Sequence, residues 1–139
     1  MSTARVEIKG SERLQKAIRS VLAENEAKGR AMIADGAYMT QLDAVKSIQT
    51  HQSSGRSYTR RSVQHTASTA GNPPNTDTGN LVRNITVNKI QGGYDVGSRA
   101  GAPYGFWLEF GTLKMAPRPW LSPAFKRSVD KLIAKWVRK

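Results

Sequence analysis

The feature that most constrains the fold is a helical pattern of apolar residues that continues for about 40 residues near the start of the chain. One helix from Ser11, as N-cap, to about His51 would be about 60 Å long at 1.5 Å per residue. A chain of 139 residues cannot cover such a helix by itself, so we expect part of its face to contact another subunit. The apolar positions are Leu14, Ile18, Val21, Leu22, Ala27, Ala31, Ala34, Tyr38, Leu42, Val45 and Ile48.

Two features bear on the limits of this helix. Arg5–Ile8 alternates polar and apolar residues and is predicted as a short strand that ends at Gly10. Gly29 and Gly36 each cost about 1 kcal/mol relative to Ala inside a helix, so the sequence leaves a bend or a break open at both positions.

Residues 52–80 are rich in Ser, Thr, Gly, Pro and Asn and show no apolar periodicity. Pro73 and Pro74 prevent regular structure locally. The segment is therefore predicted to be an extended loop, or arm, without regular secondary structure. A loop of this length is unusual inside a compact domain and is typically functional or ordered by a partner.

The second half of the chain combines strand and helix patterns. Ile85–Val87 and Tyr94–Val96, separated by Gly92 and Gly93, predict a β-hairpin. Tyr104–Phe110 is aromatic-rich and fits a third strand or a short helix. A turn region is marked by Pro117, Pro119 and Pro123. Residues 124–137 predict a terminal amphipathic helix, and its apolar side consists of Phe125, Val129, Leu132, Ile133 and Trp136.

The order strand, long helix, loop, strands and helix indicates a single α+β domain over residues 1–139. We expect a small, mostly antiparallel sheet packed with the long N-terminal helix and the C-terminal helix. Apolar residues make up only 38% of the chain. A surface that is completed by other subunits would account for this low share.

The chain carries 22 Lys and Arg residues against 10 Asp and Glu residues, which gives a formal net charge of +12. A charge of this size points first to nucleic acid as a partner. The first 50 residues are nearly balanced, however, and the excess lies in the middle loop and the C-terminal tail. Cations at a helix end also complement the helix dipole, and acidic protein neighbours are the alternative partners.

Several classes are excluded by composition. The absence of Cys excludes a disulfide framework, a zinc ribbon and a thiol nucleophile. No apolar run is long enough for a transmembrane helix, and the chain starts without the apolar stretch of a signal peptide. We therefore expect a soluble protein made in the cytoplasm.

The sequence contains no pattern for catalysis or cofactor binding. His51 and His65 lie at opposite sides of the polar loop and are interpreted as surface residues. The carboxylates of the second half are isolated, and no HExxH, GxSxG or phosphate-binding loop occurs. We expect no enzyme activity, no metal and no cofactor. A small hydrolase would have Glu109 as its only central carboxylate candidate.

Three groups of residues are candidates for interaction or for the core. The arginines of the loop, with one tyrosine between them, fit a protein that binds single-stranded nucleic acid. We favour the alternative, an interface arm whose arginines pair with carboxylates of a neighbouring subunit. The segment DTGNL fits a tight turn into the next strand. The aromatic rings around Glu109 are expected in the core, with an exposed patch at an oligomer interface as the alternative, and Arg-Pro-Trp fits a rigid corner. The loop group consists of Arg56, Tyr58, Arg60 and Arg61. The turn consists of Asp77, Thr78, Gly79, Asn80 and Leu81. The aromatic rings and the corner are Trp107, Phe110, Arg118, Pro119 and Trp120.

Read together, these stretches resemble one known family. Its central loop is similar to SGRSY at Ser54–Tyr58, HTASTAGNPP at His65–Pro74 and DTGNL at Asp77–Leu81. Its C-terminal signature is similar to YGFWLEFGT at Tyr104–Thr112 and APRPWLSPA at Ala116–Ala124, with Phe often standing where this chain has Trp120. The family comprises the neck, or head–tail connector and tail-completion, proteins of long non-contractile-tailed bacteriophages and related prophages.

The resemblance implies an α+β subunit that assembles into a ring, commonly six-fold, at the head–tail junction of a virion made in the bacterial cytoplasm. The implied partners are further copies of the chain, a head adaptor or head-closure protein and the tail tube or terminator protein, without a membrane or a cofactor. Neck ring, tail terminator and tail completion stay open as roles, as does contact of the C-terminal lysines with passing DNA. The implied signature residues are Tyr104, Trp107, Glu109, Phe110, Gly111, Thr112, Arg118, Pro119 and Trp120.

The alternative from another class is a basic, monomeric nucleic-acid-binding protein that uses the loop and the tail. Solution mass separates the two readings, because a ring has several times the mass of the 15.3 kDa chain.

Overall fold

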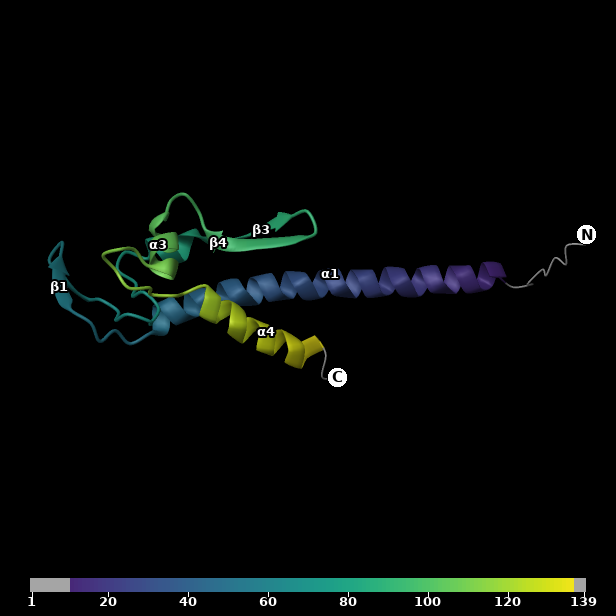
Figure 1. The fold of residues 1–139 in the computed structure, drawn as a ribbon, viewed down its shortest axis with the longest axis horizontal. Helices are drawn as coiled ribbons and strands as arrows, with labels where there is room; N and C mark the ends of the chain where they lie inside the picture. The colour runs from purple at the N-terminus through teal and green to yellow at the C-terminus, as the bar shows by residue number, and fades with distance from the viewer. Residues whose placement is uncertain (1–10, 137–139) are drawn as a thin grey trace, which may run out of the picture. The chain divides into compact units, whose positions relative to one another are not determined.

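The computed structural model describes residues 11–136 of the chain. These residues divide into two compact units, one up to Ala31 and one from Met32 onward. The elements follow the order α1, β1, β2, α2, β3, β4, α3, α4 (Figure 1). The fold is α+β, as the sequence predicts. The strand predicted at Arg5–Ile8 lies outside the described residues.

Helix α1, Ser11–Thr50, runs without interruption through Gly29 and Gly36. In the first unit, ion pairs between side chains four residues apart support the helix: Glu24 with Lys28 at 2.8 Å and Glu26 with Arg30 at 2.7 Å. Four apolar side chains of this unit are 49–62% exposed, namely Leu14, Ile18, Val21 and Leu22.

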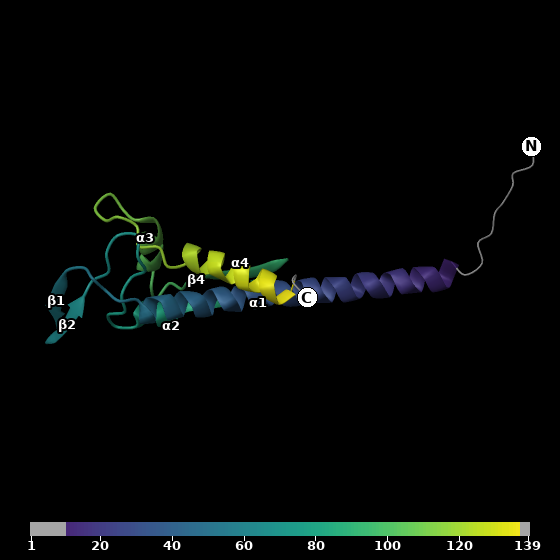
Figure 2. The same cartoon turned by 90° about the horizontal axis from the view of Figure 1, so that it is seen from below.

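In the second unit, the C-terminal part of α1 packs against α4, Ser122–Trp136 (Figures 1 and 2). Thr40 and Ser128 share a buried hydroxyl–hydroxyl hydrogen bond of 2.6 Å at this contact. A Cβ added at Gly36 would lie 3.1 Å from Leu132 Cδ2. Gly36 therefore allows close approach of the two helices and does not break α1.

Helix α4 begins two residues before the predicted start and includes Pro123, which the sequence placed in a turn region. Proline suits the first turn of a helix, because its missing N–H has no partner there in any case. The fully buried residues of α4 are Ala124 and Ser128, four apart, whereas Phe125 is 59% exposed. Two residues of the predicted apolar side, Phe125 and Ile133, are therefore exposed, because the small residues on the adjacent face pack against α1.

The sheets are two antiparallel hairpins of two strands each. The hairpin of β3, Ile85–Ile90, and β4, Gly93–Ser98, is the one that the sequence predicts. Its turn contains Gly92 at a φ of 77°.

The hairpin of β1, Ser57–Arg60, and β2, Val63–Thr66, lies inside the segment predicted to lack regular structure, so that prediction is wrong for these residues. The turn residues Arg61 and Ser62 have φ values of 49° and 62°, and positive φ at both central residues is what a type I′ turn requires. The usual Asn-Gly or Asp-Gly signal of this turn is absent, and β1 is exposed at all four positions, so no apolar alternation marks it.

Two short helices frame the second hairpin. Helix α2, Asn80–Asn84, follows the predicted turn and precedes β3, so the turn leads into a helix and not directly into a strand. Helix α3, Tyr104–Phe110, is the helical one of the two alternatives that the sequence left open.

One buried cluster joins these elements within the second unit. It connects the end of α1 to α2, β3, the segment before α3 and the start of α4. Its members are Ala44, Ile48, Leu81, Ile85, Ala102, Trp120 and Ala124, with Val45, Val82, Tyr104, Leu108 and Leu121 packed around them.

Candidate interaction surface

Glu109 of α3 fixes the start of α4. Its Oε2 accepts hydrogen bonds from the backbone N–H groups of Trp120 and Leu121, both at 2.8 Å. Its Oε1 accepts bonds from the backbone N–H of Ser122 at 2.9 Å and from the Ser122 hydroxyl. The first N–H groups of a helix have no partner inside the helix, so this carboxylate caps α4 from a separate element.

These bonds keep Glu109 ionised. Burial alone would raise the pKa of its carboxyl, because the residue is only 8% exposed. The hydrogen bonds from the Ser122 hydroxyl and from the three backbone N–H groups outweigh burial and hold the pKa of Glu109 below its usual value. Both carboxylate oxygens hold α4 in place, so the residue that a hydrolase would use has a structural role here.

Trp120 links this contact between α3 and the start of α4 to the core. It is 2% exposed, and its indole N–H donates to the carbonyl of Gly105 in α3 at 2.9 Å. The backbone N–H of Arg118 donates to the carbonyl of Leu108, also in α3, at 2.7 Å. The Arg118–Trp120 corner is therefore bonded to α3 at both ends.

The loop between α3 and this corner requires a glycine at Gly111. Its φ is 76° and its ψ is 179°, a region that residues with a side chain avoid. A Cβ at this position would lie 2.8 Å from the carbonyl oxygen of Met115. Thr112 pairs with Met115 in an isolated antiparallel bridge just beyond this point.

Three rings of α3 form an exposed surface, which we call the α3 aromatic patch: Phe106, Trp107 and Phe110. They are 63%, 53% and 65% exposed, and the rings of Phe106 and Phe110 are 4.9 Å apart. The expectation of core packing is thus wrong for Trp107 and Phe110. The physical reason is that Gly105 and Glu109 form the buried face of this short helix.

Phe106 is not among the candidate interaction residues that the sequence predicts. The signal for it is the density of rings, three in the five residues 106–110, which exceeds what one buried face of a seven-residue helix can hold.

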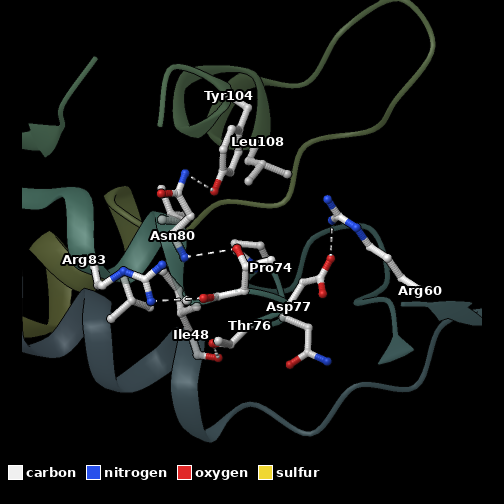
Figure 3. Close-up of a pocket in the computed structure, with 14 residues that line it drawn as sticks. Ile48, Arg60, Pro74, Thr76, Asp77, Asn80, Arg83, Tyr104 and Leu108 are labelled. Carbon is white, nitrogen blue, oxygen red and sulfur yellow. Dashed lines mark hydrogen bonds and ion pairs between the residues drawn. The ribbon is translucent and has the colours of Figure 1, made fainter. Parts of the chain in front are cut away.

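Asp77 joins the β1–β2 hairpin to the segment that precedes α2 (Figure 3). Its Oδ2 lies 2.7 Å from a guanidinium nitrogen of Arg60, and its Oδ1 lies 3.2 Å from Nε2 of His65. The interface-arm hypothesis pairs Arg60 with a carboxylate of a neighbour, but Arg60 pairs with this carboxylate of its own chain. Sequence inspection missed the contact because 17 residues separate the partners.

The turn after Asp77 has the predicted character. Gly79 has a φ of 73°, and the Thr78 hydroxyl accepts a hydrogen bond from the backbone N–H of Asn80 at 3.3 Å. The Arg83 guanidinium donates to the carbonyl of Thr78 at 3.1 Å, and Figure 3 shows Arg60 and Arg83 on opposite sides of this turn. The turn lines a cavity of about 420 Å³ that reaches Tyr104 of α3.

His65 is not a surface residue, which corrects the reading from the sequence. Its side chain is 17% exposed, its Nε2 lies 3.2 Å from Oδ1 of Asp77, and its ring stacks on Tyr58 with a ring separation of 5.7 Å. Arg56 and Arg61 are exposed, and neither forms an ion pair with the residues that the structure describes. They are therefore the hairpin cations that remain for a partner.

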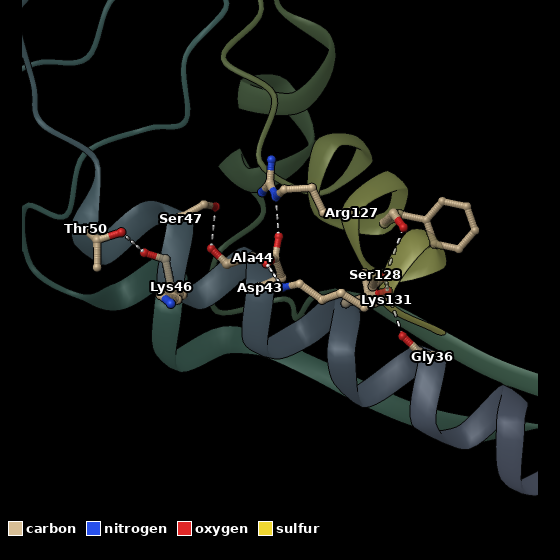
Figure 4. A network of polar contacts seen from close by, with 11 residues as sticks. Gly36, Asp43, Ala44, Lys46, Ser47, Thr50, Arg127, Ser128 and Lys131 are labelled. Carbon is tan, nitrogen blue, oxygen red and sulfur yellow. Dashed lines mark hydrogen bonds and ion pairs between the residues drawn. The ribbon is translucent and has the colours of Figure 1, made fainter. Parts of the chain in front are cut away.

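Three cations of the C-terminal tail pair with carboxylates of α1, and Figure 4 shows the two of them that pair with Asp43, namely Arg127 and Lys131. Asp43 lies 2.5 Å from Arg127 and 2.9 Å from Lys131. Lys135 lies 2.6 Å from Asp35. Burial opposes ionisation of Asp43, but the hydrogen bonds from Lys131 and Arg127 outweigh it and lower the pKa of Asp43. Much of the tail charge is thus used inside the chain.

Within residues 11–136, no group of three or more His, Cys, Asp or Glu residues is placed to hold a metal ion. Helices long and apolar enough to cross a bilayer are likewise not found in this part of the chain. Comparison of the chain with protein-family models, with curated proteins and with solved structures finds no match.

Proposed function

We propose that this chain is a structural virion protein of a tailed bacteriophage that forms a ring at the head–tail junction and joins the tail to the DNA-filled capsid. The observation that carries this proposal is the α3 aromatic patch, which exposes three large rings inside the stretch Tyr104–Thr112 that resembles the family signature. Contiguous exposed rings on a soluble protein favour an interaction site, because aromatic side chains are enriched in interfaces.

A second exposed apolar surface supports assembly into a ring. Residues 14–22 of α1 expose Leu14, Ile18, Val21 and Leu22, whose spacing puts them on one helix face. A closed ring needs two different patches on each subunit, because each subunit contacts one neighbour through one patch and the other neighbour through the second.

The hydrogen bonds of Glu109 make the α3 aromatic patch suitable for a contact between subunits. The carboxylate ties α3 to the start of α4, and Trp120 ties α3 to the core. A rigid patch loses little conformational entropy on binding, which leaves more of the burial free energy for affinity.

Sedimentation of the purified chain tests the proposal. We expect a ring several times heavier than the 15.3 kDa chain, and six copies would give about 92 kDa. The double variant Phe106→Ser with Phe110→Ser should sediment as a monomer and keep its helical circular dichroism. Ile90→Ser is the matched control, since Ile90 is also exposed but lies on β3.

The proposal fails if the wild-type chain stays a monomer at high concentration and does not bind purified tails in electron micrographs. A monomer that binds DNA of any sequence, with affinity that falls steeply with salt, would instead favour the alternative of a basic nucleic-acid-binding protein. The internal pairing of Arg127, Lys131 and Lys135 is the observation against that alternative.

The β1–β2 hairpin is the proposed arm to a neighbouring subunit or ring. Deletion of the arm tests this role. A deletion of residues 56–74 would also remove the buried residues Ser68 and Pro74, so the deletion should be confined to residues 57–66. The backbone N–H of Ala67 donates to the carbonyl of Arg56 at 3.0 Å, so a two-glycine link can join these residues. The shortened protein should fold but fail to join heads to tails, and infectious particles would disprove the arm.

A further inference from the structure

An open apolar groove of about 650 Å³ lies in the second unit, between α1, β4 and α4. The hydroxyls of Thr40 and Ser122 also line it, but they are already bonded inside the chain, to Ser128 and Glu109. Within residues 11–136, Lys126 is the one charged residue of the lining. The groove therefore suits an apolar occupant. Its larger apolar side chains include Ile33, Tyr94, Val96, Phe125, Val129 and Leu132.

The first unit carries an apolar surface that the described part of the chain leaves uncovered. Leu14, Ile18, Val21 and Leu22 lie at positions i, i+4, i+7 and i+8 of α1 and form one face, which we call the α1 ridge. Every residue from 12 to 28 is exposed. Helices in proteins gain most of their stability by packing an apolar face, so this part of α1 has an apolar face that needs a partner.

The α1 ridge and the groove match in length. Residues 14–22 span about 12 Å of helix at 1.5 Å per residue. The groove is lined by α1 from Ile33 to Thr40 and by α4 from Phe125 to Leu132, which is about 10 Å along each helix. A helix with apolar side chains at i, i+4 and i+7 is a typical occupant of such a groove. Since α1 is one continuous helix that carries both the ridge and a wall of the groove, the ridge that enters a groove comes from another copy.

We propose that the α1 ridge of one copy of this chain binds in the groove of the next copy. Pairing of two ridges is disfavoured by charge, because Arg13, Lys16 and Arg19 beside the ridge outnumber Glu12 and two positive segments would meet. The ridge and the groove are different surfaces of every copy, so the contact is head-to-tail and can close into a ring. Only this closure rests on the proposed function.

The area of the contact indicates how strongly two copies bind. A Leu, Ile or Val side chain has about 100 Å² of apolar surface, so the four ridge residues, at 49–62% exposed, offer about 200–250 Å². Ile33 and Phe125 of the groove, at 48% and 59% exposed, add about 150–200 Å². A stable pair buries about 1,200–2,000 Å² in total. Two isolated copies should therefore bind weakly, and the contact should be stable where each copy binds two neighbours.

Disulfide cross-linking between two single-cysteine variants of the full chain tests the contact. The chain has no Cys, so each variant carries one thiol and every link joins two copies. Val21→Cys on the ridge is mixed with Phe125→Cys in the groove. Both replaced residues are exposed, at 56% and 59%, so both variants should fold. A disulfide requires Cα atoms within about 7 Å of each other, so a link reports a close contact.

Ile90→Cys on β3 is the matched control for the groove variant, since Ile90 is 49% exposed and does not line the groove. We expect the link between positions 21 and 125 to form at least about tenfold faster than the link between 21 and 90, because a formed contact raises the effective concentration of the two thiols. Mass spectrometry of the linked pairs identifies which two variants are joined. Val129→Cys replaces Phe125→Cys if circular dichroism shows that the latter does not fold.

The contact is disproved if the link from position 21 to 125 forms no faster than the control link, or if two Val21→Cys chains link to each other faster, which would indicate paired ridges. A faster link from Val21→Cys to Phe110→Cys would also overturn it, because the ridge would then bind the α3 aromatic patch. Sedimentation of the mixtures before oxidation keeps the two proposals apart. The expected link without a closed ring would support the contact alone, and a ring without that link would support the ring alone.

Discussion

Replacing Glu109 with Gln should destabilise the fold strongly, because its carboxylate accepts four hydrogen bonds at the start of α4. The amide can turn its oxygen toward the N–H groups of Trp120 and Leu121, and its NH₂ then faces Ser122. The Ser122 hydroxyl can rotate to accept, so only the Ser122 N–H loses its partner. An unsatisfied N–H costs about 1–3 kcal/mol, and loss of charge on the two remaining bonds costs about 1 kcal/mol each.

The expected loss is therefore about 3–5 kcal/mol of the free energy of unfolding, out of a typical total of about 5–15 kcal/mol. For a chain of this length, that loss corresponds to a fall in Tm of about 10–17 °C. Urea unfolding followed by tryptophan fluorescence measures it. Asp130→Asn is the control, since Asp130 is an exposed carboxylate of α4 without an ion pair in the described residues, and it should change stability by less than about 0.5 kcal/mol. The capping role is refuted if Glu109→Gln is no more destabilising than this control.

The same variant gives a pH signature. The pKa of Glu109 is lower in the folded protein than in the unfolded chain, where a Glu carboxyl has a pKa of about 4.3. The stabilisation by the ionised carboxylate is therefore complete above the unfolded pKa and is lost as the pH falls through the folded pKa. The difference in stability between wild type and Glu109→Gln should be constant near neutral pH and should shrink below about pH 4. A difference that stays constant into acid would contradict this sign.

Three further substitutions test the α1–α4 contact and the hairpin turn. Thr40→Val removes the buried hydrogen bond to Ser128 and should lower the free energy of unfolding in urea by about 1–2 kcal/mol. Asp43→Asn breaks two ion pairs to half-exposed cations, so urea unfolding should show a loss of only about 0.5–1 kcal/mol that shrinks at high salt. Ser62→Gly removes a side chain at a φ of 62° and should stabilise the β1–β2 hairpin by about 0.5–1 kcal/mol, measured by hydrogen exchange at the Ala67 amide. Stabilities unchanged within about 0.3 kcal/mol would contradict these expectations.

The elements that could be predicted from the sequence are those with a local signal. The helix of residues 11–50 follows from its apolar recurrence, and the β3–β4 hairpin follows from Gly92 and Gly93 between the stretches Ile85–Val87 and Tyr94–Val96. The β1–β2 hairpin has no such signal. Its turn places Arg61 and Ser62 at positive φ, and the four residues of β1 are exposed, so neither the turn nor the strand differs from loop composition.

The sequence locates the α3 aromatic patch, but it does not predict which side of the helix is exposed. The stretch Tyr104–Phe110 is visibly aromatic, yet a helix of seven residues has only about two turns, so its apolar residues do not define a face. Its orientation is set by long-range bonds, from Glu109 to residues 120–122 and from Trp120 to Gly105. No local pattern encodes these bonds, because the partners are 11 to 15 residues apart.

The size of the α3 aromatic patch limits the kind of assembly that it can support. A ring side chain buries about 150–250 Å² when it is fully covered, so Phe106, Trp107 and Phe110, at 63%, 53% and 65% exposed, leave about 300–400 Å² to be covered by a partner. At about 25 cal/mol per Å², this area contributes about 8–10 kcal/mol, which is close to the 4–15 kcal/mol that association itself costs. The patch alone would therefore give only weak pairs. A stable interface needs further area from a second surface, and the exposed face at residues 14–22 of α1 is one candidate with the required apolar character. In a closed ring, each subunit would gain both contacts at once, so rings should form cooperatively, with few dimers or trimers at intermediate concentration.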